Sequence, residues 1–155
     1  MPAITARIDA TKAAIRDTVA ACAPIVDPSR GFVSITDPRS GHRARLESFQ
    51  EAHRFFEVVL RALPVHDRGS CRDRLEIGIR VRYERTGDID PTETAMAEDV
   101  RAIACALRQA SNWDQSTSGI TSMLIGDPDV ESLPDDDDPV FSIVSIPLTI
   151  TIRSC

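Results

Sequence analysis

The sequence predicts an α+β domain, in which about five strands form a mixed or antiparallel sheet and two main helices pack on one of its faces. Two segments space their apolar side chains as helices do, whereas the segments around them resemble strands in apolar content or alternation. With 155 residues, 42% of them hydrophobic, the chain is large enough to bury one core, and no internal repeat divides it. We therefore expect residues 1–155 to form a single domain.

The first predicted helix covers residues 3–22 and ends before Pro24. Its large apolar side chains recur at intervals of four, seven and four residues along one face: Ile4, Ile8, Ile15 and Val19. A short apolar segment follows at residues 32–35.

The second predicted helix runs from residue 90 to about 109. Its start has the residues of a capping box, with an N-cap, a proline at the first helical position and a glutamate: Asp90, Pro91 and Glu93. Apolar residues then recur along one face: Met96, Val100, Ile103 and Leu107. We expect the carboxylates of Glu98 and Asp99 on the opposite, exposed face.

The clearest predicted strand covers residues 74–84. Its apolar members alternate with charged residues and a glycine, so one face should lie on the core and the other should meet water or a partner: Leu75, Ile77, Ile79, Val81 and Tyr83. Residues 54–63 are nearly continuous in hydrophobicity, which favours a strand buried on both faces, with a helix as the alternative.

Two more strands are predicted towards the end of the chain, at 119–125 and 140–153. The last alternates aliphatic residues with serine, threonine and Pro147, and the proline predicts a sheet edge or a bulge at that point. The segments 37–48 and 126–139 are predicted to be mobile loops, or, for the second, pinned by a partner. Residues 126–139 hold three prolines and seven acidic side chains, and charges that repel one another oppose burial.

Charge is distributed unevenly over a net value of −6. Residues 1–108 carry 17 basic and 16 acidic side chains, whereas residues 109–152 carry eight acidic and no basic ones. Such an acidic half repels phosphate, which argues against a grip on nucleic acid there. No apolar run reaches the length of a membrane span, and the N-terminus lacks the pattern of a signal peptide, so we expect synthesis in the cytoplasm.

The motifs of common catalytic and cofactor sites are absent from the sequence. There is no phosphate-binding glycine loop and no G-x-S-x-G motif, and the three histidines, His42, His53 and His66, lack the spacing of metal ligands. The four cysteines are widely spaced and predict neither zinc binding nor a disulfide framework. The acidic run Asp135, Asp136, Asp137 and Asp138 is the one feature that could host a metal, although consecutive aspartates in a loop point in different directions.

In this arrangement the chain resembles the tail terminator proteins of long-tailed bacteriophages and related gene-transfer particles. The resemblance covers residues 3–153. It is carried by the N-terminal helix, the strand pair ending in RLEIGIRVRYERTGD, the helix PTETAMAEDVRAIACALR and the closing strand VFSIVSIPLTITIR. The long loops at 37–48 and 126–139 depart from smaller members of the family and are not assigned by it.

The resemblance implies a structural role with no enzymatic activity and no cofactor. Proteins of this family form hexameric rings that cap the finished tail tube and join it to the head-completion neck, and DNA passes through without being held. We accordingly expect a homo-oligomer that contacts the tail tube protein and a head-completion protein within the virion. Two alternatives stay open: another neck or tail-completion protein of similar fold, and a small metal-dependent enzyme that uses residues 135–138.

Two sets of residues are candidates for contacts in such a ring. The outer face of the strand at 74–84 offers Arg80, Arg82 and Glu84 as a subunit interface, with a merely solvated face as the alternative. Replacement of Arg82 by glutamate is then expected to leave the monomer folded and to impair assembly. The acidic run Asp135, Asp136, Asp137 and Asp138 is expected to face the lumen or the tube, where it would keep DNA from adhering.

Overall fold

The structure is a computed structural model that describes residues 4–35, 53–84, 89–109, 119–131 and 141–153. It confirms the predicted α+β class, with two helices and an open sheet of seven strands where about five were expected. The elements follow in the order α1 (Ile4–Ala20), β1 (Val33–Ser34), β2 (Phe55–Leu60), β3 (Val65–Asp67), β4 (Arg72–Glu84), α2 (Ile89–Arg108), β5 (Ile120–Ile125), β6 (Asp129–Glu131) and β7 (Phe141–Arg153). Neither helix is long and apolar enough to cross a membrane.

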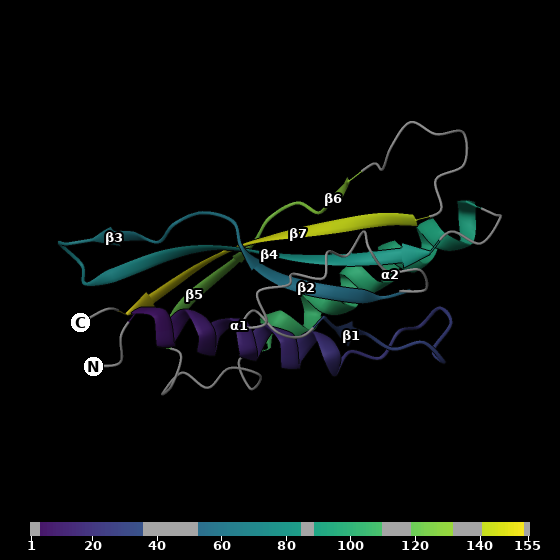
Figure 1. Ribbon diagram of the computed structural model, residues 1–155, viewed down its shortest axis with the longest axis horizontal. Coiled ribbons are helices and arrows are strands. Elements are labelled where there is room, and N and C mark those ends of the chain that lie inside the picture. The colour runs from purple at the N-terminus through teal and green to yellow at the C-terminus, as the bar shows by residue number, and fades with distance from the viewer. Residues whose placement is uncertain (1–3, 36–52, 85–88, 110–118, 132–140, 154–155) are drawn as a thin grey trace.

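The sheet is built around one long antiparallel pair, β4 and β7 (Figure 1). Thirteen residues of each strand pair in register, from Arg72 opposite Arg153 to Glu84 opposite Phe141. The main order is β1-β2-β4-β7-β5, and the short strands β3 and β6 add to β4 and β7 respectively. All pairings are antiparallel except that of β1 with β2.

Both helices lie on the same side of the sheet, as the sequence predicted (Figure 1). Because side chains alternate between the two faces of a strand, β4 and β7 each present one aliphatic row to the helices. Cross-strand partners in these rows are almost fully buried: Leu75 with Ile150, Ile77 with Leu148 and Ile79 with Ile146. The helices close the core from the other side with Ile15, Val19, Ile103 and Leu107. We call the opposite side of the sheet the outer face.

The strand β2 confirms the strand interpretation of residues 54–63, but the expectation that it is buried on both faces is wrong. Phe56 and Val58 point into the core, whereas Phe55, Glu57 and Val59 on the outer face are partly exposed. The difference arises because both helices cover the same side of the sheet, so an apolar residue on the outer face has no helix to pack against.

Pro147 does not mark a sheet edge, because β7 lies between β4 and β5. The strand on its far side is interrupted instead: β5 pairs with β7 only as far as Leu148, and β6 begins opposite Ser145. In the gap, the Gly126 amide donates a hydrogen bond of 2.8 Å to the Pro147 carbonyl. A sheet interior therefore accommodates a residue without an N–H group, because no regular partner strand stands opposite it on that side.

The predicted loop at 126–139 contains a short strand, β6, that the sequence analysis did not anticipate. The rest of that loop, at 132–139, and the predicted loop at 37–48 lie outside the described residues, as do the aspartates at 135–138. The helix α2 begins at Ile89, one residue before the predicted N-cap Asp90.

Candidate interface surfaces and a buried ionic cluster

The most strongly buried polar feature is an ion pair between Arg54, which precedes β2, and Asp99 on α2. Both side chains are fully buried, and the Arg54 Nε donates to Asp99 Oδ2 at 2.6 Å. The Tyr83 hydroxyl, from β4, donates to the same oxygen at 3.0 Å. The expectation that Asp99 lies on the exposed face of α2 is therefore wrong.

The remaining donors of Arg54 hold the segment between α1 and β1. Its guanidinium donates to the backbone carbonyls of Asp27 and Arg30, each at 2.8 Å, and to that of Val26. Arg54 itself has a φ of 61°, in the left-handed region, which is a strained conformation for a residue with a Cβ. A buried arginine with carboxylate and carbonyl acceptors thus ties α2, β2 and residues 26–30 together. We call Arg54, Asp99 and Tyr83 the ionic cluster.

His53 lies at the margin of this cluster and is half-buried. Its ring packs edge-on against Tyr83, with 5.7 Å between the centroids, and its Nδ1 accepts a hydrogen bond from the Glu84 amide at 3.2 Å. Burial, reinforced by the nearby positive charge of Arg54, lowers the pKa of His53 below its ordinary value. The neutral ring is the form that can accept this bond.

Acidification is expected to destabilise the fold through His53. Because the folded state lowers its pKa, the unfolded chain binds the proton first, so this contribution to stability is present above the unfolded pKa of about 6.5 and declines as the pH falls below it. His53→Asn keeps an acceptor for the Glu84 amide but does not titrate. Urea unfolding midpoints at pH 7.5 and 5.5 should differ less for His53→Asn than for wild type, and an equal difference would contradict the assignment.

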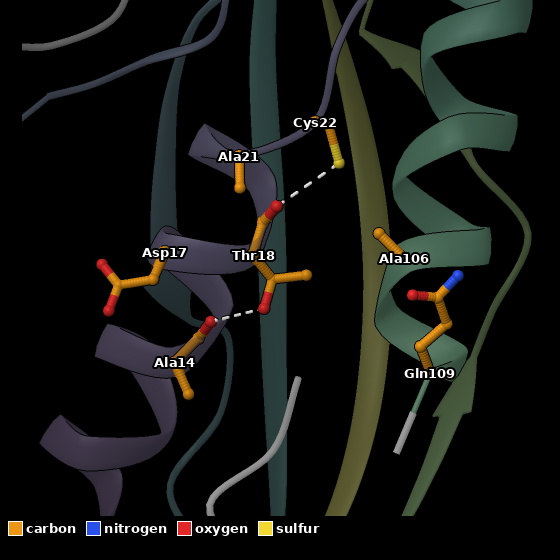
Figure 2. Close-up of a pocket in the computed structure, with 7 residues that line it drawn as sticks. All are labelled: Ala14, Asp17, Thr18, Ala21, Cys22, Ala106 and Gln109. Atoms are coloured by element: carbon orange, nitrogen blue, oxygen red, sulfur yellow. Dashed lines mark hydrogen bonds between the residues drawn. The ribbon is translucent and has the colours of Figure 1, made fainter. Parts of the chain in front are cut away.

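One hollow beside the helices, of about 490 Å³, lies between α1 and the end of α2 (Figure 2), and its lining is mostly small: Ala14, Asp17, Thr18, Ala21, Cys22, Ala106 and Gln109. Cys22 Sγ donates to the Thr18 carbonyl at 3.3 Å, and burial raises the pKa of this thiol. A second hollow of about 230 Å³ adjoins the ionic cluster and is lined in part by Asp27, Arg30 and His53. No group of three or more potential metal ligands occurs among the described residues.

The predicted interface residues of β4 lie on the outer face but already have partners within the chain. Arg80 pairs with Glu57 of β2 at 2.5 Å. Arg82 is only 2% exposed: its guanidinium stacks 3.9 Å from the centre of the Phe141 ring and lies 3.0 Å from Glu84. The alternation in sequence correctly placed these residues on the outer face, but it could not show that Phe141 covers one of them.

A hairpin formed by β3 and the start of β4 projects past the helices at one end of the molecule (Figure 1). It displays two apolar side chains, Leu63 and Val65, which are 85% and 53% exposed. Beside them are exposed arginines that form no ion pair within the described part of the chain: Arg68, Arg72 and Arg74. We call these five residues the basic arm.

The turn of the arm is well fixed by side chains. Asp67 accepts hydrogen bonds from the Gly69 amide at 3.0 Å and the Ser70 hydroxyl at 2.5 Å, and these bonds lower its pKa. Below the turn, His66 Nδ1 contacts Asp73 Oδ1 at 2.6 Å. Cys71, next to β4, is disulfide-bonded, which the wide spacing of the cysteines did not predict, while Cys22 and Cys105 are free. The arm is therefore a braced projection of the sheet.

A second exposed surface lies where β5 passes into β6. Leu124 and Val130 are 68% and 48% exposed, and Asp127 and Asp129 lie exposed between them without an ion pair in the described segments. We call these four residues the acidic corner. The sequence analysis noted the acidic stretch as a whole and did not separate this fixed part from the run at 135–138.

Comparison with known proteins does not assign a function to these surfaces. A scan against protein-family models and a search of curated proteins find no match to the chain. The candidate surfaces are therefore interpreted from their own chemistry. The ionic cluster is closed to solvent, whereas the basic arm and the acidic corner combine exposed apolar side chains with charges that form no ion pair among the described residues, a composition suited to binding another protein.

Proposed function

We propose that the protein is a structural virion subunit that forms a ring, with six copies, at the end of a phage-type tail tube. In this role it caps the finished tube and joins it to the head-completion neck, and DNA passes through the ring without specific binding. The role requires no catalytic group and no cofactor.

The observation that carries the proposal is the order of elements around a single long ribbon. A helix, a strand pair ending in β4, a second helix, an irregular strand and the long closing strand β7 follow one another as in the family that the sequence resembles. The helices cover one face of the β4–β7 ribbon and leave the other face without a helix, and the basic arm projects from one end of the sheet, where it can contact a neighbouring subunit (Figure 1).

A ring role also accounts for the exposed apolar residues. Leu63, Val65 and Leu124 expose half or more of their surface on a small domain. Large exposed aliphatic side chains that lie beside unpaired charges are typical of protein contact sites. In an assembled ring, these three side chains would be buried in contacts with neighbouring subunits.

Co-assembly with the tail tube protein of the same particle tests the proposal. Purified tube protein is allowed to polymerise with and without the full-length chain, and the products are imaged by negative-stain electron microscopy. We expect the chain to stop elongation and to sit as a ring on one end of each tube. Tubes that elongate equally in its presence, with no density added at an end, would argue against a terminator role.

A further inference from the structure

We infer that the basic arm of one copy binds the acidic corner of the next copy, and that this contact is the one that closes the ring. The inference rests on the proposed ring and names the surfaces that build it. It replaces Arg80 and Arg82 as the basic side of the contact, because both of those side chains are already engaged within the chain.

Charge complementarity is the first argument. The arm presents Arg68, Arg72 and Arg74, and the corner presents Asp127 and Asp129, all exposed and without an ion pair in the described part of the chain. Unpaired charges of opposite sign on two surfaces of one protein attract when copies meet, and they steer the copies into register.

Apolar surface is the second argument. Of the large aliphatic side chains that the described residues leave exposed, the arm holds Leu63 and Val65, and the corner holds Leu124 on the outer face. Val130 of the corner stands opposite the buried Val144 and therefore points to the helix side of the sheet. Burial of apolar area is favourable, so a contact that joins the apolar side chains of the arm to Leu124 gains affinity that charges alone would not supply. Nucleic acid would match the arginines but would leave the apolar side chains of the arm exposed.

Within one molecule the arginines of the arm and the aspartates of the corner are held apart. Arg74 lies opposite Thr151 of β7, and Asp129 lies opposite Ser145, six positions away along the same strand. At about 3.3 Å per residue this separation is roughly 20 Å, several times the span of an ion pair. Both surfaces nevertheless have members on the outer face. The register pairs each of these members with another outer-face residue: Val65 with Arg74, Arg74 with Thr151, Leu124 with Thr149 and Asp129 with Ser145.

Two different surfaces that bind each other produce a head-to-tail contact. Such a contact closes into a ring when the rotation between neighbours divides the circle, and it otherwise gives a filament. A braced arm at one end of the sheet and a fixed corner in the middle of its edge define one rotation per copy. The arm and the corner therefore suffice for the repeated head-to-tail contact that a closed ring needs.

A charge-swap experiment tests the contact directly. The arm variant carries Arg72→Glu and Arg74→Glu, and the corner variant carries Asp127→Arg and Asp129→Arg. Alone, each variant sets like charges against each other at every contact, and we expect its self-association to weaken more than about tenfold. Mixed one to one, the variants pair a Glu arm with an Arg corner and an Arg arm with an Asp corner, so every contact in an alternating ring is again attractive.

Sedimentation velocity over a range of protein concentrations and at low and high salt provides the readout. We expect the wild type and the mixture to reach the same assembled mass, an even number of chains, while each variant alone stays smaller. Association should weaken as salt rises, because exposed charges are screened. A matched control, Arg101→Glu with Arg108→Glu, reverses two exposed arginines on α2 and should assemble as the wild type does.

A photo-reactive residue at position 68 gives a second readout that does not depend on a stable ring in solution. We expect it to cross-link to residues 124–130 of another copy. The inference is overturned by cross-links that map elsewhere, by a wild type that neither associates nor cross-links, by variants that associate normally, or by a mixture that fails to recover. A closed two-chain dimer, or DNA binding that the arm variant alone abolishes, would overturn it as well.

The tube assay separates this inference from the proposed function. If the wild type caps tubes but the charge swap has no effect, the terminator role stands and a different surface joins the subunits. If the charge swap behaves as expected but the rings do not cap tubes, the contact is real and the ring works elsewhere.

Discussion

Replacing Asp99 with alanine is expected to lower the free energy of unfolding by about 3–5 kcal/mol, because it leaves a buried arginine without its counter-charge. Arg54 is fully buried and keeps only backbone carbonyls as acceptors after the change. The Tyr83 hydroxyl loses its acceptor in the same step, which adds the cost of an unsatisfied buried donor. Urea unfolding of the purified full chain, followed by circular dichroism, measures the loss.

The neighbouring residue supplies a matched control. Glu98 is on the same helix and is partly exposed, so Glu98→Ala should change the free energy of unfolding by no more than about 0.5 kcal/mol. If Asp99→Ala unfolds at the same urea midpoint as the wild type, the Asp99 carboxylate is not buried beside Arg54.

A double variant measures how much the ion pair itself contributes to the free energy of unfolding. Arg54→Met with Asp99→Leu removes both charges, and apolar replacement of a whole buried pair is often close to neutral. We expect it to be more stable than Asp99→Ala but less stable than wild type, because the carbonyls of Asp27 and Arg30 lose the donors that Arg54 supplies. Full recovery would mean that these carbonyl bonds contribute little to the fold.

The ionic cluster also shows where sequence analysis succeeds and where it fails. The spacing of Met96, Val100 and Ile103 correctly predicted a helix and its buried face. Asp99 is three residues after Met96 and four before Ile103, so the same spacing places it on that face, and only the general preference of carboxylates for water suggested otherwise. Its partner Arg54 is 45 residues away, and no local pattern links the two.

The short strands were beyond the reach of local patterns for a related reason. β3 and β6 have three residues each, which is too few for an alternation to be recognised. They are strands because β4 and β7 are longer than their neighbours β2 and β5 and offer backbone groups for pairing where those neighbours end. The basic arm and the acidic corner, which adjoin these two strands, were therefore not predicted as surfaces, although each of their charges is visible in the sequence.

Replacing Arg82 with glutamate is expected to lower the free energy of unfolding by about 3–5 kcal/mol, against the sequence-based expectation that the monomer would stay folded. Arg82 is 2% exposed, stacked on Phe141 and paired with Glu84. A carboxylate there would lie beside the Glu84 carboxylate and against the negative face of the ring, so that both attractions become repulsions.

Arg74→Glu is the control, because it makes the same change on the same strand and the same outer face at an exposed position. We expect it to cost no more than about 0.5 kcal/mol in urea unfolding. The two variants separate two roles of arginine on this face. A loss of assembly in Arg82→Glu would follow from unfolding, whereas a loss of assembly in a folded Arg74→Glu would come from the contact itself. Equal stability of the two variants would show that Phe141 does not cover Arg82 in solution, and Arg82 would again be a candidate for the interface.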